Sequence, residues 1–160
     1  MFRKLLATPD DRVLTLLRLA LGIVFFAHGA QKMLGWFGGP GYSGTMRMFE
    51  QQMHIPAVFA FLAILAEFFG GLGLLIGLLT RVAAFGIAVN MAVAIGLIHR
   101  HVGFFMNWNG TQQGEGFEFH LLALAALALV MIRGAGAYSL DHVVATSPSH
   151  SLPQPHPAHP

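Results

Sequence analysis

The chain has 160 residues, of which 55% are hydrophobic and only 10% are charged, and its formal net charge is +2. This composition excludes an ordinary soluble globular protein, and the scattered lysines and arginines give no support to nucleic-acid binding. Cysteine is absent, which excludes disulfides, thiol relays, thiolate metal sites and covalent c-type haem attachment within this chain.

The first long apolar stretch covers residues 13–34 and follows Thr8-Pro9-Asp10-Asp11. This tetrapeptide predicts a helix start with Thr8 as the cap, proline in the first turn and acids near the positive end of the helix dipole. Arg3 and Lys4 before an apolar run resemble a signal peptide. However, the run is long, contains Arg18 and lacks a small-residue cleavage site, so we expect an uncleaved first span.

The next elements follow from glycine, proline and hydrophobic spacing. Glycines and Pro40 at 38–41 end the first span, and residues 42–55 predict a short amphipathic segment at the membrane interface. Pro56 opens a second span, 56–79, which a tight hairpin at Thr80-Arg81 joins to a third, 81–99. A polar loop, 100–116, precedes the fourth span, 117–137. At ~1.5 Å per residue each span can cross a ~30 Å hydrocarbon core, so we predict an all-α membrane protein with a four-transmembrane-helix bundle.

Positive charge predicts the orientation of this bundle. Placing both termini in the cytoplasm leaves only Arg47 and Arg100 clearly outside and puts most basic residues inside: Arg3, Lys4, Arg12, Arg81 and Arg133. We expect one transmembrane domain over residues 1–142. The Pro- and His-rich segment 143–160 predicts a disordered C-terminal tail.

Every span carries ionisable or amide side chains, which are costly in lipid and therefore usually face one another or a polar cavity. These residues are Arg18, His28 and Lys32 in the first span, Glu67 in the second, Asn90 and His99 in the third, and Glu118 and His120 in the fourth. Small residues recur beside them at helical spacing, as in the predicted third-span stripe Ala83, Gly86, Asn90, Ala94, Leu97 and His101. We therefore expect these stripes to meet inside the bundle.

Glu67 is the strongest functional candidate. It is either a proton-handling or substrate-contacting carboxylate in the bundle core, or the partner of Arg18, Lys32 or His28 in a charge pair that fixes helix register. Neutral imidazoles bind metals and haem, and His28, His99, His101 and His120 lie at compatible depths. None of them shows a recognised ligand spacing within one helix, so we expect neither a metal nor a haem site.

Taken together, these motifs resemble the DoxX family of small four-helix membrane proteins over roughly residues 10–142. The matching features are Leu17-Arg18, Phe26-Ala-His28-Gly-Ala-Gln-Lys32, Glu67-Phe-Phe-Gly70-Gly71, Gly77-Leu-Leu-Thr80-Arg81, His101, Glu118 and Tyr138-Ser-Leu-Asp141. The first-span pattern combined with the glutamate of the second span is fairly specific as a set.

The resemblance implies a multi-pass protein of the cell membrane that is associated with redox chemistry, since related proteins include the DoxD-type subunit of a thiosulfate:quinone oxidoreductase. The function it favours is a redox-associated subunit that binds quinone within the bundle, beside partner subunits that carry redox enzymes. Glu67 would then be the catalytic residue, and the quinone or substrate would contact Arg18, His28, Lys32, Asn90, His101, Glu118 and His120.

Two alternatives stay open: a non-catalytic scaffold for peripheral redox enzymes, and a small-solute permeation or export protein. The sequence leaves open whether the chain is itself an enzyme, and it does not predict an oligomeric state.

Overall fold

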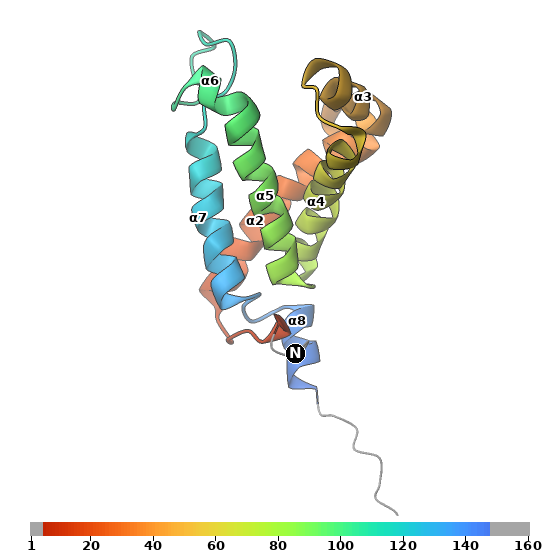
Figure 1. Cartoon of the computed structure of the whole chain (residues 1–160). Helices are drawn as coiled ribbons and strands as arrows, with labels where there is room; N and C mark the ends of the chain where they lie inside the picture. Colours follow the sequence, from red (N-terminus) through yellow and green to blue (C-terminus); the bar gives the residue numbers. More distant parts are fainter. Residues whose placement is uncertain (1–4, 148–160) are drawn as a thin grey trace, which may run out of the picture.

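The computed structural model describes residues 5–147, and within that range every regular element is a helix. In chain order these are α2 (Arg12–Leu34), η1 (Trp36–Gly38), α3 (Gly41–Arg47), η2 (Met48–Gln52), α4 (Ala57–Ile76), α5 (Thr80–Ala94), η3 (Ile95–His99), α6 (Arg100–Val102), α7 (Glu118–Arg133) and α8 (Leu140–Thr146). The long helices form a bundle with α3 and α6 at one end and α8 at the other (Figure 1). We call these the α6 end and the α8 end.

Three helical runs in the described part of the chain are long and apolar enough to cross a membrane. They are Arg12–Leu34, Ala57–Ile76 and Thr80–Val102, the last of which joins α5, η3 and α6. These runs match the first three predicted spans, and the all-α prediction is confirmed. α7 has 16 residues and is therefore about 24 Å long, which makes it shorter than the predicted fourth span.

Helix α2 begins at Arg12 and is capped by Asp11, so the prediction that Thr8 forms the cap is wrong. The Asp11 carboxylate accepts hydrogen bonds from the N–H groups of Val13 at 2.9 Å and Leu14 at 3.1 Å. An aspartate immediately before the first turn satisfies those orphan donors and favours the positive helix terminus. The Thr8 hydroxyl instead accepts from the Gly136 N–H at 2.6 Å, tying the N-terminal segment to the turn after α7.

Glycines bring α2 and α4 into direct backbone contact. A Cβ atom on Gly29 would lie 2.4 Å from the Cα of Phe68, and one on Gly71 would lie 2.3 Å from the backbone nitrogen of Phe26. No larger residue fits at either position without separating the helices. We call this contact the α2–α4 seam, and it confirms the prediction that small residues beside the polar ones mark helix–helix contacts.

The α4–α5 connection is a tight hairpin, as predicted. Gly77 ends α4 in the left-handed region at φ 70°, and Leu79 precedes α5 at φ 48°. The Asp141 carboxylate accepts from the N–H groups of Leu79 and Thr80, each at 2.8 Å, while the Asp141 N–H donates to Gly77 O at 2.8 Å. A residue from beyond the last long helix therefore fastens the hairpin.

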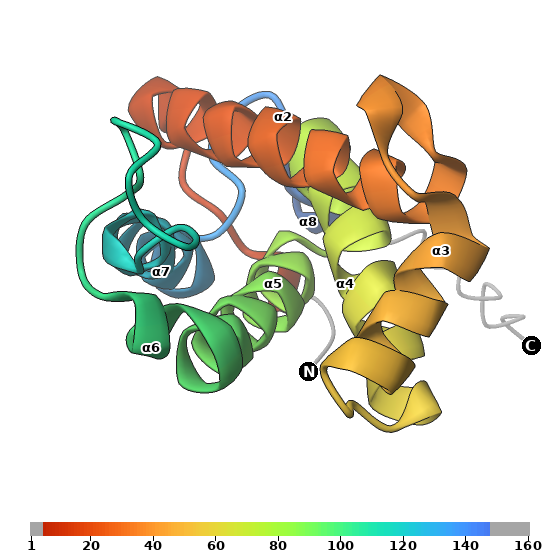
Figure 2. The same ribbon diagram turned by 90° about the horizontal axis from the view of Figure 1, so that it is seen from above.

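The apolar core lies between α2, α4, α5 and α7. Its buried members are Leu14, Leu21, Phe25, Leu74, Ala84, Ile87, Met91, Ala123, Leu127 and Val130. Viewed from above, α2 runs along one side of the bundle, with α5 and α7 across from it (Figure 2). Large apolar side chains also point outward, among them Val13 and Ile132 at 76% and 73% exposure, which is typical of a lipid-facing surface.

Helix α8 runs from Leu140 through Thr146, past residue 143, the predicted start of the tail. Its N-cap is Ser139, whose hydroxyl accepts from the His142 N–H at 3.1 Å. The remainder of the predicted tail, 148–160, lies outside the described residues.

Candidate functional site

Lys32 and Glu67 form an ion pair between α2 and α4. Lys32 lies in the last turn of α2, and its Nζ contacts Oε2 of Glu67, whose side chain is 5% exposed. The pair forms because Gly29, one turn before Lys32, lets the backbones of the two helices touch beside Glu67. Of the predicted charge partners of Glu67, the structure therefore selects Lys32.

His120 and His99 lie ring against ring between α7 and η3. Their centroids are 4.0 Å apart with an interplanar angle of 41°. His120 is only 7% exposed, and within the described residues its Nδ1 has no hydrogen-bond partner. The Nδ1 of His99 contacts the Glu115 carbonyl oxygen at 2.8 Å. A buried imidazole nitrogen without a partner is uncommon, because leaving it unpaired costs about 1–3 kcal/mol.

His28 belongs to the same end of the bundle. It lies one turn beyond the core residue Phe25 on α2, and it is exposed. A ring contact joins His99 to His120, while His28 lies on α2 near the same end of the bundle.

A π turn determines which histidine of the third span faces the bundle. Residues Ile95–His99 form η3, in which an extra residue per turn rotates every later side chain around the helix axis. His101 is consequently exposed, and its Nε2 accepts from Arg100 Nε at 3.2 Å. Leu97 is 53% exposed as well, so the predicted inward stripe of this span is wrong beyond Ala94.

Asn90 and Glu118 make hydrogen bonds that organise the fold. The Asn90 side chain donates from Nδ2 to the Ala63 carbonyl oxygen at 3.1 Å, which links α5 to α4. Oε1 of Glu118 accepts from the Met106 N–H at 2.8 Å and from the Trp108 indole at 3.3 Å. Glu118 therefore anchors the loop between α6 and α7.

The structure places Arg18 away from the other predicted site residues, at the α8 end. Its guanidinium is 1% exposed and donates to backbone carbonyl oxygens: Nε to Ala135 at 2.9 Å, Nη1 to Leu75 at 2.8 Å and also to Leu74, and Nη2 to Tyr138 at 2.8 Å. A cation at the carboxyl end of α4 is stabilised by the helix dipole and satisfies carbonyls that have no partner within the helix. Arg18 therefore connects α2, α4 and the segment after α7.

Two further residues at the α8 end, Arg81 and Asp141, also connect segments through hydrogen bonds from their side chains to backbone groups. Neither was among the predicted site residues. Arg81 donates from Nε to the Met131 carbonyl oxygen at 2.9 Å and from Nη1 to those of Leu5 and Ala7, each at 2.9 Å. Asp141 caps α5. The sequence offers a signal for each, since Arg81 belongs to the predicted hairpin and Asp141 is an acid that follows the last apolar span.

Neither the α6 end nor the α8 end gathers a metal-ligand set. Among residues 5–147 no group of three or more His, Asp or Glu side chains is arranged to hold a metal ion. The bundle does hold a carboxylate paired with an ammonium between α2 and α4, and, between η3 and α7, an imidazole whose Nδ1 has no partner among residues 5–147. Each of these groups can exchange a proton or form a hydrogen bond with a bound carbonyl compound.

Comparison with known proteins places these features in a family. The DoxX family profile matches residues 13–100 of the chain. The chain is also 30% identical over 135 residues to the inner membrane protein YqjF of Escherichia coli (strain K12), an alignment that covers 84% of this chain and 94% of that protein. No solved structure matches the chain.

Proposed function

Because the chain belongs to the DoxX family and is a multi-pass protein of the cell membrane, we propose that it is a redox-associated subunit that binds a quinone between its helices at the α6 end. The observation that carries this proposal is the Nδ1 of His120, which is buried beside the ring of His99 and has no hydrogen-bond partner among residues 5–147. A buried nitrogen of this kind is satisfied when a ligand supplies the missing hydrogen-bond partner.

The proposed topology is four transmembrane helices with both termini cytoplasmic, within a domain that covers residues 1–142. α7 is the fourth crossing, and slight thinning of the bilayer accommodates a helix of about 24 Å. Arg81 contacts Leu5, and Arg133 lies 3.7 Å from Asp11, so both arginines belong to the α8 end together with Arg12. This excess of positive charge supports a cytoplasmic α8 end.

In this proposal the His120 imidazole would donate a hydrogen bond to a quinone carbonyl, and His28 would contact the quinone from the exposed side of α2. A bound quinone would supply redox chemistry that takes up two electrons and two protons, with the electrons coming from a partner redox subunit. Glu67, held against Lys32, would be the group that exchanges protons. Asn90 and Glu118 keep the helices and the loop around the site in position.

The proposal leaves Arg18 and His101 out of the quinone site, where the family resemblance had placed them. The guanidinium of Arg18 is already occupied by carbonyl oxygens, which supports a purely structural role. His101 contacts Arg100 on the outside of the helix, which supports its exclusion from the site.

The test is quinone retention by the full chain purified in mild detergent, measured by solvent extraction and mass spectrometry. We expect a quinone to copurify with the wild type. We expect His120→Phe, which preserves the ring contact with His99 but removes the nitrogen, to reduce retention about tenfold. Glu67→Gln should leave quinone bound but abolish quinone-dependent turnover with the native partner subunit.

The matched control is His101→Phe, the same substitution at an exposed position on the neighbouring helix. Equal retention by His120→Phe and His101→Phe contradicts the proposed site, and so does wild-type protein free of quinone. In the latter case a stoichiometric copurifying partner would instead indicate a scaffold. Solute flux in liposomes would indicate a permeation protein.

A further inference from the structure

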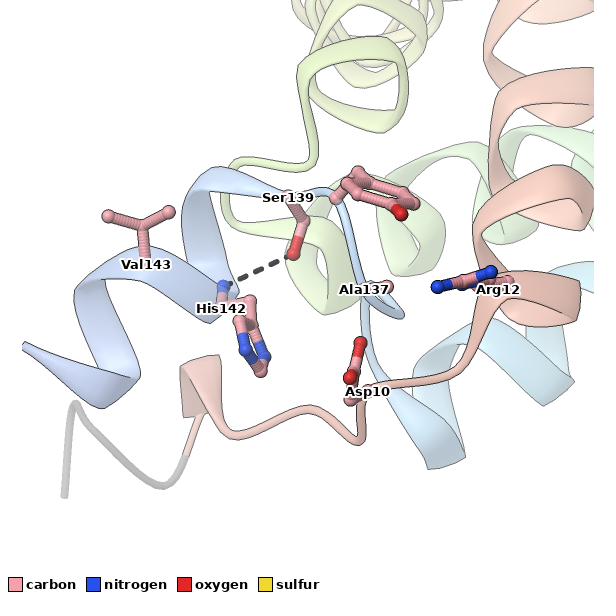
Figure 3. Close-up of a pocket in the computed structure, with 7 residues that line it drawn as sticks. Asp10, Arg12, Ala137, Ser139, His142 and Val143 are labelled. Atoms are coloured by element: carbon pink, nitrogen blue, oxygen red, sulfur yellow. Dashed lines mark hydrogen bonds between the residues drawn. The ribbon is translucent and has the colours of Figure 1, made fainter.

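A second polar site lies at the α8 end, remote from the proposed quinone site. A surface pocket of about 310 Å³ opens between the start of α2 and helix α8 (Figure 3). It is lined by Asp10, Arg12, Ala137, Tyr138, Ser139, His142 and Val143. The pocket therefore combines an acid, a base, an imidazole and two hydroxyl groups.

Within residues 5–147 the charged side chains of this pocket make no contacts that hold the fold together. Asp10 and Arg12 are both exposed, and neither side chain has a hydrogen bond or ion pair with another of residues 5–147. The Nδ1 of His142 is buried and lacks a partner within the same range. Figure 3 shows Asp10, Arg12 and His142 on the walls of the pocket. The side chains of Asp10, Arg12 and His142 therefore surround the pocket with polar atoms that form no hydrogen bond or ion pair among residues 5–147.

The pocket lies where a lipid headgroup would lie. Arg12 is the first residue of the membrane-crossing helix α2. On the same face, one and three turns further along, Leu16 and Ile23 are 68% and 62% exposed. Tyr138, at the rim of the pocket, is 72% exposed, and aromatic residues with a polar tip favour the membrane interface. An apolar strip on α2 therefore leads from the hydrocarbon region to the polar pocket.

We propose that this pocket binds the headgroup of an aminophospholipid such as phosphatidylethanolamine, with the acyl chains lying along Leu16 and Ile23. The Arg12 guanidinium donates to the phosphate oxygens, a geometry for which its planar fork is suited. The Asp10 carboxylate accepts from the primary ammonium, and His142 bonds a further phosphate oxygen.

Charge and hydrogen bonding together select this headgroup. Phosphatidylglycerol has no cation to neutralise Asp10. Phosphatidylcholine has a cation that carries no N–H group, so it cannot donate a hydrogen bond to that carboxylate. The site concerns different residues from the quinone proposal and stands independently of it.

The test is native mass spectrometry of the full chain, stripped of lipid in detergent and titrated with phosphatidylethanolamine, phosphatidylglycerol or phosphatidylcholine of identical acyl chains. We expect phosphatidylethanolamine to bind on the order of tenfold more tightly than either competitor. Arg12→Gln should weaken all three lipids, because all carry a phosphate. Asp10→Asn should weaken phosphatidylethanolamine selectively and so remove its advantage.

The matched controls are Arg47→Gln and Glu50→Gln, which remove the same charges from exposed positions at the α6 end. Equal affinity for the three lipids overturns the proposal, as does unchanged binding in both pocket variants.

A titration with soluble phosphoethanolamine distinguishes a lipid from a free phosphate ester. If it binds as tightly as the intact lipid, the ligand is a free phosphate ester and the lipid assignment is wrong. Thermal unfolding of each variant establishes that it is folded.

Discussion

The two ends of the bundle hold buried polar side chains in opposite ways. At the α8 end, Arg18 and Asp141 are 1% and 2% exposed, and both are bonded to backbone groups left open at the ends of α4 and α5. At the α6 end, within the part of the chain that the structure describes, Glu67 pairs with one lysine and the Nδ1 of His120 has no hydrogen-bond partner. A polar group satisfied by the backbone stabilises the fold, whereas one left incomplete is available to a ligand.

The largest loss of stability is expected for Arg18→Met. Methionine fills a similar volume but leaves the carbonyl oxygens of Leu75, Ala135 and Tyr138 without their donor. We expect the free energy of unfolding to fall by about 3–4 kcal/mol. Thermal and denaturant unfolding in detergent measure this loss, with Arg47→Met as the control. A loss below about 1 kcal/mol would remove the contrast between the ends.

Asp141→Asn should have the next largest effect. The amide retains one oxygen, but its NH₂ group then faces an N–H of Leu79 or Thr80. We expect a loss of about 2 kcal/mol, at the upper end of the range for helix caps. Glu50→Gln, at an exposed position, is the control for the same measurement. If Asp141→Asn and Glu50→Gln both have the free energy of unfolding of the wild type, Asp141 does not stabilise the α4–α5 hairpin.

The ion pair at the α6 end should matter less. Lys32→Met leaves the carboxylate of Glu67 without its cation, and we expect a loss of about 1 kcal/mol because Lys32 is 24% exposed. The double variant Lys32→Met with Glu67→Gln should recover most of that loss, since no uncompensated charge remains. Additive losses in this double-mutant cycle would show that the two residues do not act as a pair.

His120→Phe should change stability least. The substitution removes Nδ1, which has no hydrogen-bond partner in the described range 5–147, and keeps an aromatic ring against His99. We therefore expect the free energy of unfolding to change by less than about 0.5 kcal/mol. The same variant should lose most of its quinone. A large loss of stability would mean that His120 belongs with Arg18 among the residues that hold the fold together.

The sequence predicted the membrane helices well because their signal is local. The signals for the long apolar runs, for the hairpin at Thr80-Arg81 and for the inward position of Gly29 depend only on length and helical spacing. The same spacing placed Lys32 and Glu67 on inward faces, and the structure pairs them. It could not choose among Arg18, His28 and Lys32, because that choice depends on how α2 crosses α4.

The missed features depend on contacts distant in the chain or on irregular backbone. Arg18 donates hydrogen bonds to the carbonyl oxygens of Ala135 and Tyr138, which are more than 100 residues away in the chain. No local sequence pattern predicts that the segment after α7 packs against the first half of α2. The π turn at Ile95–His99 exchanged the roles of His99 and His101, since a regular helix had been assumed there. Thr8 and Asp11 are both good caps, and only the position of the first helical hydrogen bond distinguishes them.

The close contact of the α2 and α4 backbones at Gly29 and Gly71 restricts where a hydrophobic ligand can enter the bundle from the bilayer. Where the backbones of α2 and α4 touch at these two glycines, neither an isoprenoid chain nor a fatty acyl chain can pass between the helices. A hydrophobic molecule that reaches His120 from the bilayer would therefore have to enter between another pair of helices.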